Sequence, residues 1–161
     1  MGAPGARPEG MREDAAASER PERAASGPTG EELARAWFAH SPLIGALGMQ
    51  LVAIAAEEAT VVLPYRADLA TAGDIVHGGA IMSLLDTAAA LAAWSAHDPS
   101  RGVRWGTVSV SVSFLEPARG RNLSASAHVT RRGRNICFCR VDVEDSEQSP
   151  VAEALVSYRL G

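Results

Sequence analysis

The stretch HGGAIMSLLDTAAALAAWSA, residues 77–96, decides the fold of this chain. Between residues 78 and 96 there is no proline and a single charged side chain, Asp86, so the segment predicts one long helix. Its length is close to the minimum for crossing a bilayer. A carboxylate near the middle would be costly in lipid, and alanine dominates the composition. We therefore expect a helix enclosed by its own domain, with no membrane span.

Alternating apolar and polar residues around this helix predict strands. In the clearest case, residues 108–114, valine and phenylalanine alternate with serine. Strands do not alternate regularly with helices along the chain, which disfavours a doubly wound parallel sheet. The sequence therefore predicts an α+β fold in which a mostly antiparallel sheet packs around one buried helix. The other predicted elements are a helix at 31–40 ended by Ser41 and Pro42, strands at 49–56, 59–65, 122–130, 135–143 and 151–160, and a loop at 66–74.

The first 32 residues differ in composition from the rest. They contain four prolines and no Val, Ile, Leu, Phe, Trp or Tyr, too little apolar surface to offset the entropy cost of ordering. We expect a disordered N-terminal tail over 1–32 and one domain over 33–161. The chain carries a net charge of −4, most of it in the tail. The sequence therefore lacks the broad basic face of a nucleic-acid-binding protein.

Two cysteines stand two residues apart in the predicted strand 135–143. Cys137 and Cys139 would point to the same face of that strand, where a disulfide between them is sterically poor and no partners for a metal site are evident. We interpret them as small buried apolar residues. Without a disulfide framework, and without the apolar segment of a secretory signal, we expect a cytoplasmic protein that binds no metal.

The start of the long helix, His77-Gly78-Gly79, carries the first functional signal. The first turn of a helix has free N–H groups and a partial positive charge, and glycines allow a ligand to approach them closely. Such a site suits the oxyanion that develops on a carbonyl group. Taken alone, the two glycines also fit a flexible helix start, and His77 also fits a capping residue.

Asp86 carries the second signal. On a helical projection Ile81, Leu84 and Leu85 share a broad aliphatic face, and Asp86 lies opposite, among small residues. We expect it to point into a confined space at a boundary between subunits, where a carboxylate must be hydrogen-bonded. The alternatives are a solvated helix residue or an acid paired with an arginine.

Four segments, VHGGA (76–80), LDTA (85–88), TVSVSVSFLEPA (107–118) and RGR (132–134), resemble the hotdog-fold thioesterases, in particular the PaaI-type acyl-CoA thioesterases. The resemblance spans roughly residues 35–160. It implies a hotdog fold, in which a curved antiparallel sheet wraps around one long central helix. It also implies a homo-oligomer, a dimer or a homotetramer built as a dimer of dimers, with active sites between subunits.

The resemblance further implies roles for single residues. The amide of Gly78 would polarise the thioester carbonyl, and Asp86 from the neighbouring subunit would act as nucleophile or as general base on water. His77 would help to shape the pocket, and the hydroxyl of Thr107 would orient water or the carboxylate. Many relatives carry Asn or Gln seven residues before the first glycine, where this chain has Thr71. Threonine is shorter and cannot present an amide to substrate or water.

Other residues are expected to contact the substrate. Gly79 lies at the helix start, and Met82 and Ser83 flank Asp86 on the helix; Met82 also fits the core. The phosphates of coenzyme A would suit the arginines of the turn that follows residue 130, which alternatively form a solvated hairpin. These arginines are Arg131, Arg132 and Arg134.

The sequence therefore predicts an acyl-CoA thioesterase that releases a free acid and coenzyme A. No cofactor is expected, since coenzyme A enters as part of the substrate, and neither nucleic acid nor a membrane is an expected partner. The chain has no Gly-x-Ser-x-Gly motif, which disfavours a serine hydrolase of that type. Two alternatives stay open: a non-catalytic acyl-CoA-binding hotdog protein, which Thr71 would favour, and a hotdog enoyl-CoA hydratase or dehydratase that uses His77 and Asp86.

Overall fold

The computed structural model describes residue 2 and residues 27–161 of the chain. The tail predicted for residues 1–32 therefore lies mostly outside the described residues. The helices are α1 (Gly30–His40), α2 (Pro42–Leu47) and α3 (Gly78–Ser95), with the short 3-10 helices η1 (Ala67–Leu69) and η2 (Pro99–Arg101). The strands are β1 (Gln50–Ala55), β2 (Glu58–Leu63), β3 (Ala70–Ala72), β4 (Ile75–Val76), β5 (Trp105–Phe114), β6 (Leu123–Arg132), β7 (Ile136–Asp145) and β8 (Pro150–Leu160).

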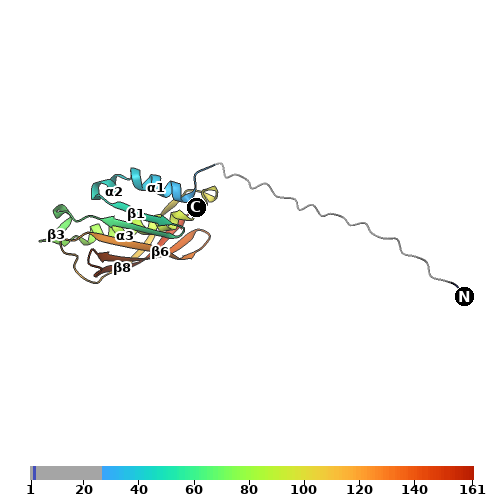
Figure 1. Ribbon diagram of the computed structural model, residues 1–161. Helices are drawn as coiled ribbons and strands as arrows, with labels where there is room; N and C mark the ends of the chain where they lie inside the picture. The colour runs from blue at the N-terminus through green and yellow to red at the C-terminus, as the bar shows by residue number, and fades with distance from the viewer. Residues whose placement is uncertain (1, 3–26) are drawn as a thin grey trace.

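The long strands form one antiparallel sheet in the order β1-β2-β6-β7-β8-β5, and β3 pairs separately with β4. Pairing in the main sheet runs from Gln50 opposite Val62 at one edge to Phe114 opposite Ala152 at the other. α3 contacts all six of these strands, and the curved sheet wraps one side of it (Figure 1). The structure confirms the predicted α+β architecture, an antiparallel sheet around one long central helix.

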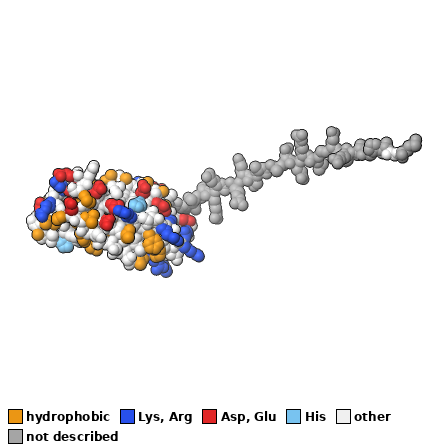
Figure 2. All heavy atoms as spheres, turned by 90° about the horizontal axis from the view of Figure 1, so that it is seen from below, with side chains coloured by type: hydrophobic (Ala, Val, Ile, Leu, Met, Phe, Trp, Pro, Cys, Tyr) orange, Lys and Arg blue, Asp and Glu red, His pale blue; other side chains and the backbone are white. Residues whose placement is uncertain are grey.

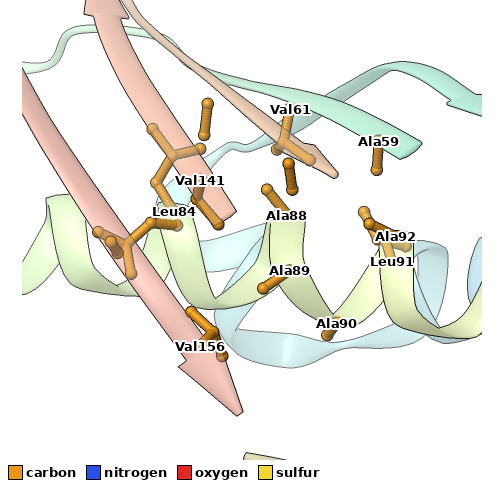
Figure 3. Packing of buried hydrophobic residues seen from close by; sticks show 14 of the residues in the cluster. Ala59, Val61, Leu84, Ala88, Ala89, Ala90, Leu91, Ala92, Val141 and Val156 are labelled. Carbon is orange, nitrogen blue, oxygen red and sulfur yellow. The ribbon is translucent and has the colours of Figure 1, made fainter. Parts of the chain in front are cut away.

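α3 packs on the sheet through alanine and leucine. Twelve of its eighteen residues are buried, and Leu84 has no exposed surface at all. Figure 3 shows Leu84 and Ala88 pointing toward Val141 and Val61 of the sheet. Alanine methyl groups let the helix backbone come close to the strands, and burying each leucine side chain contributes about 2 kcal/mol. The alanine and leucine residues that predicted an enclosed helix are thus the residues that pack against the sheet.

α1 covers the C-terminal end of α3. Its N-terminus is closed by a capping box, in which Thr29 and Glu32 exchange hydrogen bonds between side chain and backbone. A Cβ added at Gly30 would lie only 2.3 Å from the carbonyl oxygens of Trp94 and His97. The start of α1 therefore lies directly against the last turn of α3, a distance that only glycine allows. α1 begins at Gly30, a few residues before the domain start predicted at residue 33.

The structure differs from the prediction in two segments. Ser41 and Pro42 end the first helix as predicted, but Pro42 also starts α2, because proline is well suited to the first position of a helix. α2 ends at Gly48, whose φ of 71° glycine adopts without strain. Residues 66–74, predicted as a loop, contain η1 and the strand β3, which pairs with β4 directly before α3.

The two cysteines lie on the side of β7 that faces α3. Cys137 and Cys139 are both fully buried and are not linked by a disulfide. The Cys139 Sγ lies 3.7 Å from the carbonyl oxygen of Ala89. Hydrogen bonding to Cys137 and burial raise the pKa of the Cys139 thiol well above its usual range. This confirms their interpretation as small buried residues.

The surface carries charges of both signs. In Figure 2 acidic and basic side chains are interspersed with hydrophobic ones over the face seen from below. Over residues 27–161 no helix is long and apolar enough to cross a membrane. In the same part of the chain no group of His, Cys, Asp and Glu side chains is arranged to hold a metal ion.

Candidate active site

His77 caps the N-terminus of α3 with both its backbone and its ring. Its backbone is extended (φ −63°, ψ 133°), and its Nδ1 accepts a hydrogen bond of 2.8 Å from the amide of Gly79. Its carbonyl oxygen accepts hydrogen bonds from the amides of Ala80 (2.9 Å) and Ile81 (3.2 Å). One residue therefore supplies the acceptors for three of the first four amides of the helix.

The amide of Gly78 is the remaining one. Among the described residues it donates no hydrogen bond. It shares in the partial positive charge of the helix start, and Gly78 itself is half-buried. A Cβ at this position would lie 3.4 Å from Cζ of Phe114, so the phenyl ring borders the amide on one side. The helix start thus offers one N–H to one incoming oxygen atom.

Asp86 lies about two turns further along α3, on the side that faces the edge strand β5. It is half-buried, and the hydroxyl of Thr107 donates a hydrogen bond of 2.6 Å to its Oδ1. Thr107 stands opposite Tyr158 of β8, and the pairing shifts by one residue between Thr107 and Ser109. Such a bulge re-aims side chains along a strand. The result is a short, charge-assisted hydrogen bond that fixes one oxygen of the carboxylate.

Gly78 and Asp86 of one chain do not meet. They are eight residues apart on the same helix, which corresponds to about 12 Å along its axis. An aspartate side chain spans only a few ångströms. A single carbonyl group bonded to the Gly78 amide is therefore out of reach of Asp86 in the same chain.

Two hollows flank the helix start. One, with a volume of about 270 Å³, is lined by His77 and Gly79 together with apolar residues of α2. The other, with a volume of about 380 Å³, is lined by Gly78, Thr71 and the segment 114–118. The structure thus places Thr71 beside Gly78, and it separates the two glycines into different hollows.

The other helix residues predicted to contact substrate lie around the same turn. The Ser83 hydroxyl donates a hydrogen bond of 2.9 Å to the carbonyl oxygen of Gly79, and Ser83 lines the hollow beside His77. Met82 is 42% exposed, so its side chain is outside the core. Both residues are available at the surface of α3, and their contact with substrate stays a prediction.

The predicted arginine cluster lies at the opposite end of α3. The guanidinium of Arg132 donates to the Glu57 carboxylate (2.7 Å) and to the carbonyl oxygen of Ala93 (2.9 Å). Ala93 is fifteen residues after Gly78, about 22 Å along the axis. Arg131 and Arg134 are exposed. In one chain these arginines are therefore remote from the free amide, and Arg132 is engaged in holding β6 against the helix.

Two residues that lie at the site were not predicted from the sequence to belong to it. Phe114 belongs to the alternating strand, where its spacing indicated only a strand position, and it borders Gly78. Tyr158 stands opposite Thr107, is 4% exposed, and lies near the Asp86 carboxylate. Burial raises the pKa of Tyr158 to about 12, so it stays protonated beside that carboxylate. The register of β5 on β8 brings Tyr158 beside Thr107, and local sequence patterns do not specify that register.

Comparison with known proteins shows the family to which the chain belongs. The sequence model of the thioesterase superfamily matches residues 73–152, which include Gly78, Asp86 and Thr107. The medium/long-chain acyl-CoA thioesterase YigI of Escherichia coli (strain K12) is 31% identical over 135 residues, which cover 76% of this chain and 87% of that protein. The chain belongs to the thioesterase superfamily. This thioesterase is therefore an enzyme, a thioester hydrolase.

Solved structures of PaaI proteins share its fold. The E. coli PaaI protein from the phenylacetic acid degradation operon superimposes with a TM-score of 0.72 at 25% identity, covering 82% of this chain and 94% of that one. A mutant of the phenylacetic acid degradation protein PaaI from Thermus thermophilus gives a TM-score of 0.64 at 28% identity, covering 73% and 97%. The likeness confirms the hotdog fold predicted for this thioesterase.

Proposed function

We propose that this thioesterase hydrolyses acyl-CoA to a free acid and coenzyme A, in a site that two copies of the chain form together. The observation that carries the proposal is the amide of Gly78, which donates no hydrogen bond among residues 27–161, at a residue that lines an apolar hollow. The hydrogen bond between Thr107 and Asp86 supplies a fixed carboxylate. The name of the relative YigI, an acyl-CoA thioesterase, supports coenzyme A as the acyl carrier.

In the proposed reaction the Gly78 amide donates a hydrogen bond to the thioester carbonyl oxygen and stabilises the negative charge that develops there. Asp86 takes a proton from a water molecule, whose oxygen attacks the carbonyl carbon. When the tetrahedral intermediate collapses, the C–S bond breaks and the proton passes from Asp86 to the coenzyme A sulfur. The products are the free acid and the thiol, and no metal or cofactor takes part.

Asp86 offers a second route, as a nucleophile. Its oxygen would attack the carbonyl carbon, the coenzyme A thiolate would leave, and water would hydrolyse the resulting anhydride. Labelled oxygen can enter the Asp86 carboxylate only by this second route. A gain in protein mass after single turnovers in heavy-oxygen water would therefore establish the second route, with water attacking the Asp86 carbon of the anhydride.

The distance along α3 supports a site in which the carboxylate comes from a second copy. β5 is an edge strand of the sheet, with one side open for pairing. Antiparallel pairing of β5 with the β5 of another copy, about the middle of the strand, places Thr107 of one copy near Val112 of the other. Val112 lies two residues from Phe114, which borders Gly78. The two-fold symmetry would therefore carry Asp86 of one copy to Gly78 of the other.

The same arrangement gives the coenzyme A phosphates a place. Arg132 is bonded to the carbonyl of Ala93, seven residues beyond Asp86, or about 10 Å along the helix. When Asp86 of a second copy lies beside Gly78, the arginine turn of that second copy lies about 10 Å beyond the thioester carbonyl. We propose that the exposed Arg131 and Arg134 contact the phosphates there.

The test compares wild type and Asp86→Asn with acetyl-, hexanoyl-, decanoyl- and palmitoyl-CoA. We expect hydrolysis by the wild type and a loss in kcat of at least about 100-fold in the variant. Tight binding without hydrolysis would instead favour a non-catalytic acyl-CoA-binding protein, and hydration of an enoyl-CoA would favour a hydratase. If the wild type hydrolyses none of the four acyl-CoA compounds, the proposal is refuted.

Complementation tests the composite site. Asp86→Asn and a second inactive variant, Gly78→Pro, are co-expressed with different tags, and mixed dimers are isolated. One of the two sites in a mixed dimer would combine an intact amide with an intact carboxylate, so activity should return. Mixed dimers as inactive as both parents would place the two groups in one chain.

A further inference from the structure

The arginines that have no carboxylate partner lie together at one end of the domain. Within residues 27–161 there are eleven arginines, and six of them form an ion pair with Asp or Glu. We refer to the other five, all exposed, as the five-arginine surface: Arg101, Arg104, Arg131, Arg134 and Arg159. Figure 2 shows basic side chains gathered at the right-hand end of the domain, where Figure 1 places the C-terminus.

The pairing of four strands brings these side chains together. Arg159 of β8 stands opposite Gly106 of β5 on one side and Ile136 of β7 on the other. The guanidinium of Arg101 donates a hydrogen bond of 2.7 Å to the carbonyl oxygen of Arg134, in the turn between β6 and β7. Because β6, β7, β8 and β5 are neighbours in the sheet at a spacing of about 4.8 Å, the five-arginine surface is about 14 Å wide.

The two carboxylates near this surface do not neutralise it. Glu57 is bonded to Arg132, which is not one of the five. Asp98 accepts a hydrogen bond of 3.0 Å from the Ser100 amide, and hydrogen bonding to Ser100 holds the pKa of Asp98 below its usual value. Five exposed positive charges therefore repel one another at one end of a chain whose net charge is −4. Such a surface attracts a negatively charged partner and is stabilised when that partner binds.

The shape and composition of the surface favour a protein as that partner. Cys137 and Cys139 face α3, so Phe138 between them points to the outer side of the sheet, where it is 44% exposed. Phe138 stands opposite Arg131 and is a diagonal neighbour of Arg159. Arginine and aromatic side chains are enriched at protein interfaces, whereas small ligands bind in concave sites. The five arginines line neither of the two hollows beside the start of α3.

The surface also lies within reach of the proposed site. In the two-copy arrangement the turn that carries Arg131 and Arg134 lies about 10 Å beyond the thioester carbonyl. A phosphopantetheine arm is about as long as four extended residues, or about 14 Å. A protein bound to the five-arginine surface could therefore extend such an arm to the Gly78 amide of the other copy.

We propose that the five-arginine surface docks an acidic protein that carries the acyl group as a thioester on a phosphopantetheine arm. The inference rests on the proposed function, because the arm must deliver its carbonyl to the site formed by Gly78 and Asp86 of two copies. Hydrolysis then breaks the same C–S bond. The acyl group leaves as the free acid, and the carrier protein keeps the thiol.

The experiment compares one acyl group on three carriers. Decanoyl thioesters of pantetheine, of coenzyme A and of the acyl carrier protein of bacterial fatty acid synthesis are given to wild type and to the double variant Arg104→Ala/Arg159→Ala. We expect kcat/KM for the carrier-protein thioester to fall about tenfold or more through KM, and activity on decanoyl-pantetheine to stay within about twofold. Arg140→Ala is the matched control, because Arg140 lies on the same face but is paired with Asp142, and it should leave all three activities unchanged. Added salt should weaken only hydrolysis of the charged substrates.

The outcomes separate this inference from the proposed function. An equal loss with decanoyl-CoA and with the carrier-protein thioester would show that the surface binds the phosphates of coenzyme A, and docking of a protein would be refuted. A wild type that hydrolyses decanoyl-CoA but neither binds nor hydrolyses the carrier-protein thioester would also refute it, with the proposed function intact. An equal loss in Arg140→Ala would dismiss the five-arginine surface as the cause. Should the double variant fail to fold, Arg104→Gln/Arg159→Gln keeps longer side chains and should show the same loss. A wild type that hydrolyses none of the three thioesters would overturn the proposed function itself.

Discussion

Replacing Gly78 with proline removes one hydrogen-bond donor and leaves the backbone of the helix start in place. Gly78 is the first residue of α3, where proline is tolerated because its fixed φ is already helical. The preceding residue, His77, has a ψ of 133°, which is the conformation that a following proline requires. A Cβ at position 78 would lie 3.4 Å from the ring of Phe114, an ordinary contact distance. The substitution therefore keeps the backbone of the helix start and replaces the amide N–H with the ring Cδ, which also fills part of the space of an incoming oxygen.

The expected loss of activity is large because no neighbouring amide can replace this donor. The amides of Gly79, Ala80 and Ile81 are all bonded to His77. Removal of one oxyanion donor lowers kcat by about 100- to 1000-fold, or about 2.7–4 kcal/mol. Gly78 is only half-buried, and solvent weakens an exposed hydrogen bond, so we expect a loss near the lower end, about 100-fold.

Steady-state release of the coenzyme A thiol measures the effect on kcat. Gly78→Ala is the matched control, because it adds the same Cβ but keeps the N–H, and it should stay within a few-fold of wild type. Thermal unfolding establishes that both variants fold. If Gly78→Pro retains more than half of the wild-type kcat, or if Gly78→Ala is equally impaired, the Gly78 amide does not stabilise the oxyanion.

Three further predictions follow from other contacts. Thr107→Val removes the hydroxyl bonded to the proposed catalytic carboxylate; such a bond to a charged group contributes about 1.5 kcal/mol, so kcat/KM should fall about tenfold. Leu84→Ala leaves a cavity at a fully buried position and should lower the free energy of unfolding in urea by about 3 kcal/mol. The Ser149 amide and the Arg121 guanidinium hold the pKa of Asp145 below its usual value. The unfolded state therefore binds more protons, and stability is lost as the pH falls below about 4, a loss that urea unfolding should find smaller in Asp145→Asn.

Each prediction has a result that would contradict it. Thr130→Val removes another strand hydroxyl, one that donates to the carbonyl of Phe138, and it should leave kcat/KM unchanged; an equal loss in both threonine variants would dismiss the role of Thr107. Leu155→Ala changes a leucine that is 62% exposed and should alter stability by less than about 0.5 kcal/mol. Parallel pH profiles for wild type and Asp145→Asn would show that this carboxylate does not govern acid stability.

The central helix and the main strands were predictable because each leaves a pattern among residues close in sequence. A single charge between residues 78 and 96 indicated a buried helix, and α3 occupies Gly78–Ser95. The alternation of valine and serine from residue 108 indicated β5. α2 and β3 were not predicted, because six and three residues are too few to show a periodicity.

Contacts between distant segments leave no such local pattern. The bond from the Arg132 guanidinium to Glu57, which lies 75 residues earlier in the chain, was not predicted, and the contact of Arg132 with coenzyme A stays a prediction. Only the pairing of β2 with β6 brings the two together. The hydrogen bond from Gly79 to the His77 ring is local, but it depends on the backbone angles of the cap rather than on residue types. The resemblance pointed to the Gly78 amide, but only the geometry of the cap shows that the neighbouring amides of Gly79, Ala80 and Ile81 are already bonded.

The capping of α3 by His77 also bears on competing anions. Phosphate and sulfate are held at helix starts by several free amides at once, which surround more than one of their oxygens. His77 occupies the amides of Gly79, Ala80 and Ile81, so a single N–H is left. One N–H suits a carbonyl group, which presents a single oxygen, and holds a tetrahedral anion poorly. The capping histidine thereby gives the helix start a selectivity that its partial positive charge alone would not provide, and the thioester does not have to displace a bound phosphate.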